Sequence, residues 1–163
     1  MRAIILAALV ASALASPVAA QEKAANAGQI VEAVNACKAI TSPTWIDLKK
    51  LPSLGWQPYT KSAGRKQMKV GGAYTKKGNE ALLVIGSDEL ETKSCVVLAR
   101  LGAGGEYGAT AQGVSQIIGM PSAQQDFTYI WDRDGQRITL DPSGERDAPK
   151  ARFAVIAVKG ETE

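Results

Sequence analysis

Histidine is absent from the 163 residues of this chain. The absence excludes Ser-His and Cys-His nucleophilic systems, the usual general base near neutral pH, and zinc sites that contain histidine. Only two cysteines are present, so a cysteine-rich structural zinc site is excluded as well. Carboxylate pairs, lysine-assisted catalysis and a calcium site of oxygen ligands stay open. Each exclusion favours a binding or structural role, with no catalytic residues, no metal and no cofactor.

Long apolar runs are also missing, except near the N-terminus. Arg2 is followed by an apolar run over residues 3–15, then by Pro17 and by the small residues Ala19 and Ala20. This order is typical of a secretory signal peptide. The run is shorter than the roughly 18 to 20 residues that cross a bilayer, which disfavours the alternative of a membrane anchor.

We therefore predict a signal peptide over residues 1–20 that is cleaved before Gln21. The mature chain is then a single domain over residues 21–160 with a polar tail over 161–163. No later segment is apolar enough to be transmembrane. The expected location is the periplasm of a Gram-negative cell, or otherwise the outside of the cell.

The two cysteines, Cys37 and Cys95, are far apart in the sequence and lack the C-x-x-C spacing of redox-active pairs. In an exported chain, an even pair of cysteines is expected to be oxidised. We therefore predict a structural disulfide between Cys37 and Cys95, with a reactive thiol pair as the alternative.

A complete phosphate-binding loop is missing too. Residues 101–115 read LGAGGEYGATAQGVS, but the third glycine of G-x-G-x-x-G would fall at Tyr107, and Gly108 comes one residue late. The lysine and hydroxyl residue of the P-loop pattern are absent. We predict a flexible corner between a strand and a helix, with a small anion-binding nest of backbone amides as the alternative.

The alternation of apolar residues and the positions of turn residues predict an α+β fold. An N-terminal helix and a central helix are expected to pack on one face of an antiparallel sheet made of two three-stranded meanders. The similar order of the two halves suggests a pseudo-duplication, and whether the strands form one sheet or two stays open. The expected helices are 22–40, 45–51 and 109–119, and the expected strands are 68–75, 81–87, 94–101, the hairpin within 127–140, and 152–160.

The hairpin around Asp134 and Gly135 contains two aspartates close together. Asp132 and Asp134 are spaced as in part of a calcium loop, but Ile130 stands where the first ligand should be and no glutamate closes the loop. A tight Asp-Gly turn is therefore predicted rather than a metal site or an acid-base pair.

One segment, KSAGRKQMK over residues 61–69, is basic and contains no carboxylate. It could bind an anionic polymer or lipid headgroups, or be a solvated loop. Nucleic acid is not expected, because aromatic residues do not alternate with the charges. Removing Arg2 with the signal peptide leaves 18 of the 19 basic residues against 16 acidic ones, so the whole chain is nearly balanced.

The sequence therefore predicts a small exported, non-catalytic envelope protein that serves as an accessory or binding module. Its expected partner is another envelope protein or an anionic cell-envelope polymer. The alternatives are a small-ligand carrier with an internal pocket, and a hydrolase or lyase that uses carboxylates or lysine. The candidate binding residues are the basic group and three aromatic residues that would lie on an uncovered sheet face if exposed: Lys61, Arg65, Lys66, Lys69, Tyr74, Tyr129 and Trp131.

Overall fold

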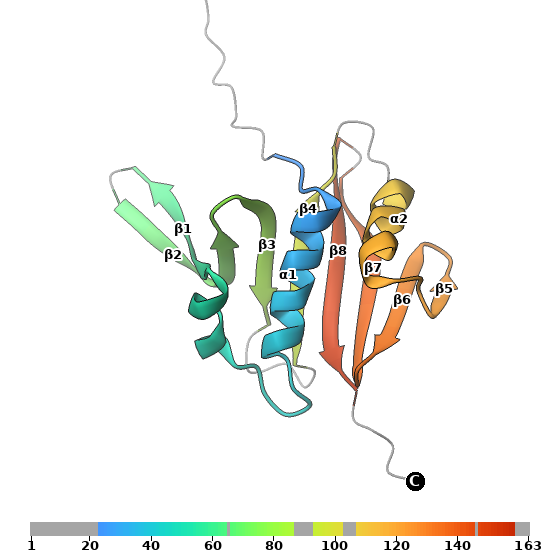
Figure 1. The fold of residues 1–163 in the computed structure, drawn as a ribbon. Helices are drawn as coiled ribbons and strands as arrows, with labels where there is room; N and C mark the ends of the chain where they lie inside the picture. The colour runs from blue at the N-terminus through green and yellow to red at the C-terminus, as the bar shows by residue number, and fades with distance from the viewer. Residues whose placement is uncertain (1–22, 65, 87–92, 103–106, 146, 159–163) are drawn as a thin grey trace, which may run out of the picture.

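Eight antiparallel strands form one sheet, and two α-helices lie against one of its faces (Figure 1). The computed structural model describes residues 23–64, 66–86, 93–102, 107–145 and 147–158. The predicted α+β class is confirmed, and the strands belong to a single sheet. The helical elements are α1 (Ala27–Ile40), the short 3₁₀ helices η1 (Leu48–Lys50) and η2 (Pro52–Leu54), and α2 (Tyr107–Ile118). The strands are β1 (Trp56–Ala63), β2 (Lys66–Lys76), β3 (Asn79–Ile85), β4 (Ser94–Arg100), β5 (Ala123–Gln125), β6 (Thr128–Arg133), β7 (Gln136–Glu145) and β8 (Ala148–Ala157).

The strand order is mirrored about the centre of the sheet. It runs β1-β2-β3-β4-β8-β7-β6-β5, so the last strand of each half meets the last strand of the other. Each half begins with a helix and continues with four strands. A duplicated unit joined at β4 and β8 would have this order, although duplication of the sequence itself stays a prediction.

The prediction of three strands in each half was wrong, because β1 and β5 had not been expected. β1 contains Pro58 and has six exposed positions among its eight residues, so no apolar alternation marks it. β5 has only three residues, all of them exposed. Both strands are at the edges of the sheet. Few of their residues are buried, so their sequences show no alternation of apolar and polar residues.

The expected strands leave residues 141–150 outside the sheet, but most of these residues extend β7 and β8. Pro142 and Pro149 pair within these strands, opposite Ala151 and Gly144. Pro149 lies one residue past the last position that pairs with β4, and Pro142 lies two residues past the last position that pairs with β6. A missing N–H therefore leaves no ladder partner unsatisfied there.

Helix α1 begins at a capping box. The side chain of Asn26 accepts from the backbone N–H of Gln29 at 2.9 Å, and the side chain of Gln29 accepts from the N–H of Asn26 at 3.0 Å. One face of the helix, which includes Ile30, Val34 and Cys37, is fully buried against the sheet. The predicted N-terminal helix is confirmed, with its start at Ala27 rather than at residue 22.

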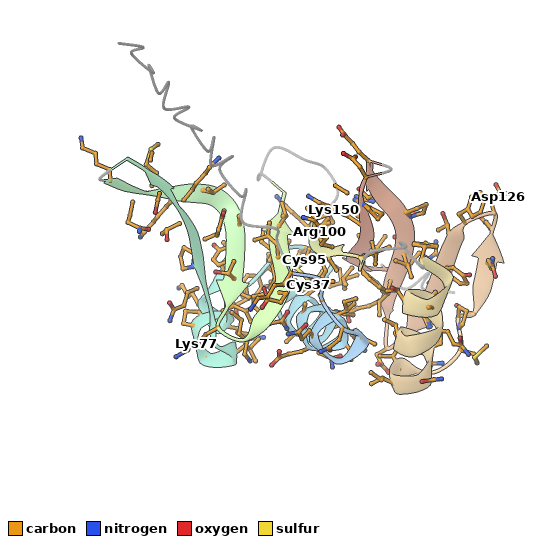
Figure 2. The ribbon with its side chains drawn as sticks, turned by 90° about the horizontal axis from the view of Figure 1, so that it is seen from above. Cys37, Lys77, Cys95, Arg100, Asp126 and Lys150 are labelled. Carbon is orange, nitrogen blue, oxygen red and sulfur yellow. A yellow bond between two sulfur atoms is a disulfide. The ribbon has the colours of Figure 1, made fainter. Side chains whose placement is uncertain are left out.

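The predicted disulfide between Cys37 and Cys95 is confirmed. It joins α1 to the central strand β4, with the two Cα atoms 5.4 Å apart, and both cysteines are fully buried (Figure 2). A stable bond of this kind indicates a non-reducing compartment. Of the helices within the described ranges, none has the length and apolar character needed to cross a bilayer.

A buried asparagine fixes α1 to the start of β3. The side-chain amide of Asn79 donates to the carbonyl of Gln29 and to the carboxylate of Glu32, each at 2.8 Å, and its oxygen accepts from the N–H of Ala81 at 2.9 Å. Lys76 also contacts Glu32, at 2.7 Å. Hydrogen bonds from Lys76 and then Asn79 hold the pKa of the Glu32 carboxyl below its usual value.

Replacing Asn79 with alanine should lower the free energy of unfolding by about 2 kcal/mol, because the buried N–H of Ala81 would lose its partner. Urea unfolding followed by circular dichroism measures this change. Glu80→Ala, at the exposed neighbouring position, is the matched control and should change stability by less than about 0.5 kcal/mol. Equal effects of the two substitutions would contradict the role given to Asn79.

Candidate functional site

The three aromatic candidates lie on the side of the sheet that the helices cover. Trp131 is fully buried, and its indole N–H donates to the carbonyl of Gly119 at 2.8 Å. Tyr74 and Tyr129 are half-buried and pack against the core. These residues were predicted to bind a partner only if they were exposed on an uncovered face. That condition is not met, because strand alternation turns them toward the side of the sheet that the helices cover.

The basic residues lie on strands rather than in a loop. Lys61 is in β1, Lys66 and Lys69 are in β2, and all three are exposed. Arg65 is outside the described residues. The structure therefore brings the described lysines together on one hairpin, whose strand β2 also contains Tyr74, and it leaves Tyr129 and Trp131 apart from them on β6.

The face of the sheet opposite α1 and α2 is not covered by any helix in the described ranges, and we call it the open face (Figure 2). Along β3, β4 and β8, the residues that point to the open face are half-buried or exposed and alternate with buried ones. A group of six aliphatic, half-buried residues occupies the middle of this face, and we call it the aliphatic centre: Leu82, Val84, Val96, Leu98, Ala154 and Ile156. Register confirms that they are neighbours, since Leu82 faces Leu98 and Val96 faces both Val84 and Ala154.

On β6, β7 and β8 the charged residues of the open face pair with one another. Asp141 accepts from the hydroxyl of Thr128 at 2.6 Å and lies 3.5 Å from Arg152. Asp132 contacts Arg137 at 2.7 and 3.1 Å, and these hydrogen bonds hold the pKa of the Asp132 carboxyl below its usual value. A carboxylate that stays ionised in this way is poorly suited to act as a general acid near neutral pH.

Arg100 differs from these paired residues. It lies at the end of β4, directly opposite Lys150 on β8, and none of the carboxylates in the described ranges pairs with its guanidinium. Two like charges directly opposite each other on neighbouring strands lower the stability of a sheet. Arg100 is therefore a cation that forms no ion pair with the carboxylates of the described ranges.

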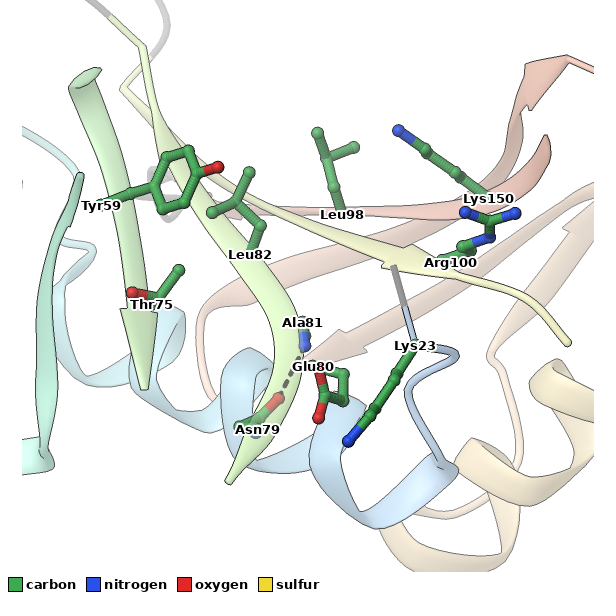
Figure 3. A pocket seen from close by; sticks show the side chains of 10 residues that line it. All are labelled: Lys23, Tyr59, Thr75, Asn79, Glu80, Ala81, Leu82, Leu98, Arg100 and Lys150. Carbon is green, nitrogen blue, oxygen red and sulfur yellow. Dashed lines mark hydrogen bonds between the residues drawn. The ribbon is translucent and has the colours of Figure 1, made fainter. Parts of the chain in front are cut away.

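A pocket of about 280 Å³ begins at Arg100 and extends across β3 toward β1 (Figure 3). Figure 3 shows Arg100 and Lys150 at one end, the hydroxyl of Tyr59 directed inward from the other end, and Leu82 and Leu98 between them. The pocket therefore combines an apolar floor with charged residues of both signs, with Arg100 and Lys150 at one end and Lys23 and Glu80 also in its lining. Such an arrangement can accept an apolar group that carries a carboxylate.

The features that would indicate catalysis are weak in the described residues. Asp134 is exposed and pairs with Lys38 at 3.1 Å, and Asp134 and Gly135 both have the positive φ values of a tight hairpin turn, as predicted. No group of three or more acidic or cysteine residues within the described ranges could hold a metal ion. Most of the glycine-rich corner, residues 103–106, is outside the described residues, but the strand before it is antiparallel to both neighbours. Dinucleotide-binding loops follow parallel strands instead.

Large side chains fill the layer between the sheet and the helices. Trp56, Trp131 and Phe153 are each at most 1% exposed, and they belong to one continuous core. This filled layer disfavours the alternative of a carrier with an internal pocket.

Sequence reasoning missed Arg100 and the aliphatic centre. In β4, SCVVLAR, both sets of alternating positions contain apolar residues. This pattern is typical of a central strand whose two faces both contact something, and it was the available signal.

Comparison of the chain with protein-family models, with curated proteins and with solved structures finds no match.

Proposed function

We propose that this protein is a non-catalytic, exported binding module that docks another envelope protein on the open face of its sheet. The observation that carries the proposal is the aliphatic centre with Arg100 at its margin, whose guanidinium pairs with none of the carboxylates in the described part of the chain. Protein interfaces combine an apolar middle with a polar rim and are enriched in arginine. The partner we propose carries a carboxylate that pairs with Arg100 and apolar side chains that cover Leu82 and Leu98.

The expected export of the chain supports the same proposal. The signal peptide predicted over residues 1–20 and the buried disulfide are both typical of a periplasmic or extracellular protein. An exported protein without a catalytic site most simply acts by contact with other envelope components.

Crosslinking from the two sides of the sheet tests the proposal. A photoreactive residue at Val96, in the aliphatic centre, should crosslink one discrete protein in envelope extract. The same residue at Gln112, which is exposed on α2, serves as the control and should not crosslink this protein. Crosslinking of the same protein only from Gln112 would overturn the proposal.

Affinity for the purified partner is the second part of the test. Leu98→Glu and Arg100→Ala should each weaken binding at least about tenfold, because interface positions of this kind contribute more than about 1.4 kcal/mol. Lys49→Ala removes an equal charge from an exposed residue of η1 and should leave the affinity unchanged. Titration calorimetry measures all three, and unchanged affinity in both open-face variants would contradict the proposal.

A further inference from the structure

The outer part of the β1–β2 hairpin is a two-stranded ribbon. β2 pairs with β3 only over Ala73 to Lys76, but it continues to pair with β1 as far as Lys66. We call residues 60–63 and 66–70 the arm. Every residue of the arm is exposed, and the arm extends away from the rest of the sheet (Figure 1).

The base of the arm is irregular in both strands. The pairing register shifts between Pro58 and Thr60 on β1. On β2, Gly72 has a φ of +69°, and a Cβ atom there would lie 2.6 Å from the carbonyl oxygen of Ile85. Only glycine is compatible with this conformation and this close approach. The chain therefore bends at the base of the arm, and the arm leaves the sheet with both of its faces accessible.

The two faces of the arm differ in character. Lys61 lies opposite Met68 and Ala63 lies opposite Lys66, and strand alternation places Val70 on the same side. We call this side the amphipathic face. The other side is polar throughout: Thr60 lies opposite Lys69, and Gln67 donates to the hydroxyl of Ser62 at 3.2 Å.

The apolar residues of the amphipathic face are unusually exposed, and its lysines lack described ion-pair partners. Met68 is 58% exposed and Val70 is 39% exposed. Lys61 and Lys66 make no ion pair with the described carboxylates, and neither does Lys69. A two-stranded ribbon is marginally stable by itself, so large exposed apolar residues on it gain nothing for the fold.

We infer that the amphipathic face of the arm docks on a lipid bilayer that carries anionic headgroups. Lys61 and Lys66 contact the headgroup phosphates, and Met68 and Val70 enter the interfacial layer between them. Charge complementarity selects an anionic partner, and the apolar pair selects a bilayer over a polyanion, which would need positive charge alone. This inference does not depend on a partner at the open face.

Co-sedimentation of the mature chain with vesicles tests the inference. Binding to phosphatidylcholine vesicles that contain phosphatidylglycerol should be clear, and binding to phosphatidylcholine alone should be weak. Lys66→Gln should lower the partition coefficient about fivefold, as expected for one lysine close to an anionic surface. Lys69→Gln makes the same chemical change on the polar face of the same strand and should lower it clearly less.

A second pair of variants separates a bilayer from an anionic polymer. Met68→Ser should weaken binding to anionic vesicles severalfold, whereas Gln67→Ser, on the polar face, should not. Failure of the unmodified chain to bind anionic vesicles would overturn the inference. Equal losses in Lys66→Gln and Lys69→Gln with no loss in Met68→Ser would also overturn it, because such binding would depend on charge alone.

Discussion

Replacing Trp131 with alanine should lower the free energy of unfolding by about 3 to 5 kcal/mol, because it leaves a large cavity in a filled core. The side chain is fully buried, and its ring centroid lies 6.3 Å from that of Tyr129. The substitution would also remove the hydrogen bond from the indole to the carbonyl of Gly119, which joins β6 to the end of α2. Urea unfolding of the oxidised protein, followed by circular dichroism, measures the loss.

Trp45→Ala is the matched control for this prediction. It makes the same chemical change at a residue that is 56% exposed, so its effect should stay within about 0.5 kcal/mol. A similar loss in both variants would mean that Trp131 does not have the packing described here.

The second large effect concerns the disulfide. Replacing both Cys37 and Cys95 with alanine should destabilise the protein by about 4 kcal/mol in the chain-entropy model, because the bond closes a long loop in the unfolded chain. The two residues are separated by 58 positions in the sequence. Unfolding of the oxidised protein and of the double variant should be compared under identical conditions.

Reduction provides an internal control for the same effect. The wild-type protein should lose most of this stability when a reductant is added, while the double variant should not respond. If the reductant shifted the unfolding midpoints of both proteins equally, the loss could not be assigned to the bond between α1 and β4.

Local signals in the sequence were sufficient to predict several elements of the fold. The spacing of Val34 and Cys37 marked α1, and the Asp134–Gly135 dipeptide marked the hairpin of β6 and β7. The disulfide followed from the number of cysteines and the expected compartment. Each of these inferences depends on residues close together in the chain or on composition.

The features that define the candidate site depend on contacts between distant residues. Cys95 and Val155 are neighbours because β4 pairs with β8, and no local sequence pattern predicts that pairing. Alternation places Trp131 on one side of β6, but it cannot tell which side the helices cover. The open face, and the position of Arg100 at its margin, therefore depend on the pairing of the two halves and could not be predicted from local sequence.

The arm was missed for a different reason. Lys61, Lys66 and Lys69 resemble a solvated loop, since few apolar residues accompany them and their strands are exposed on both sides. Strand pairing there is set by the hairpin turn rather than by burial. Met68 and Val70 were the remaining signal, because they alternate with polar residues within β2.

The mirrored strand order also bears on aggregation. The outer strands expose little regular backbone for another chain to pair with: β5 has three residues, and β1 contains Pro58 and Lys61. The longer strands β4 and β8, of seven and ten residues, have neighbours on both sides only while the two halves stay joined. A lesion that separates the halves would uncover two long apolar edges, so variants at the β4–β8 seam are expected to form intermolecular sheets before the chain unfolds completely.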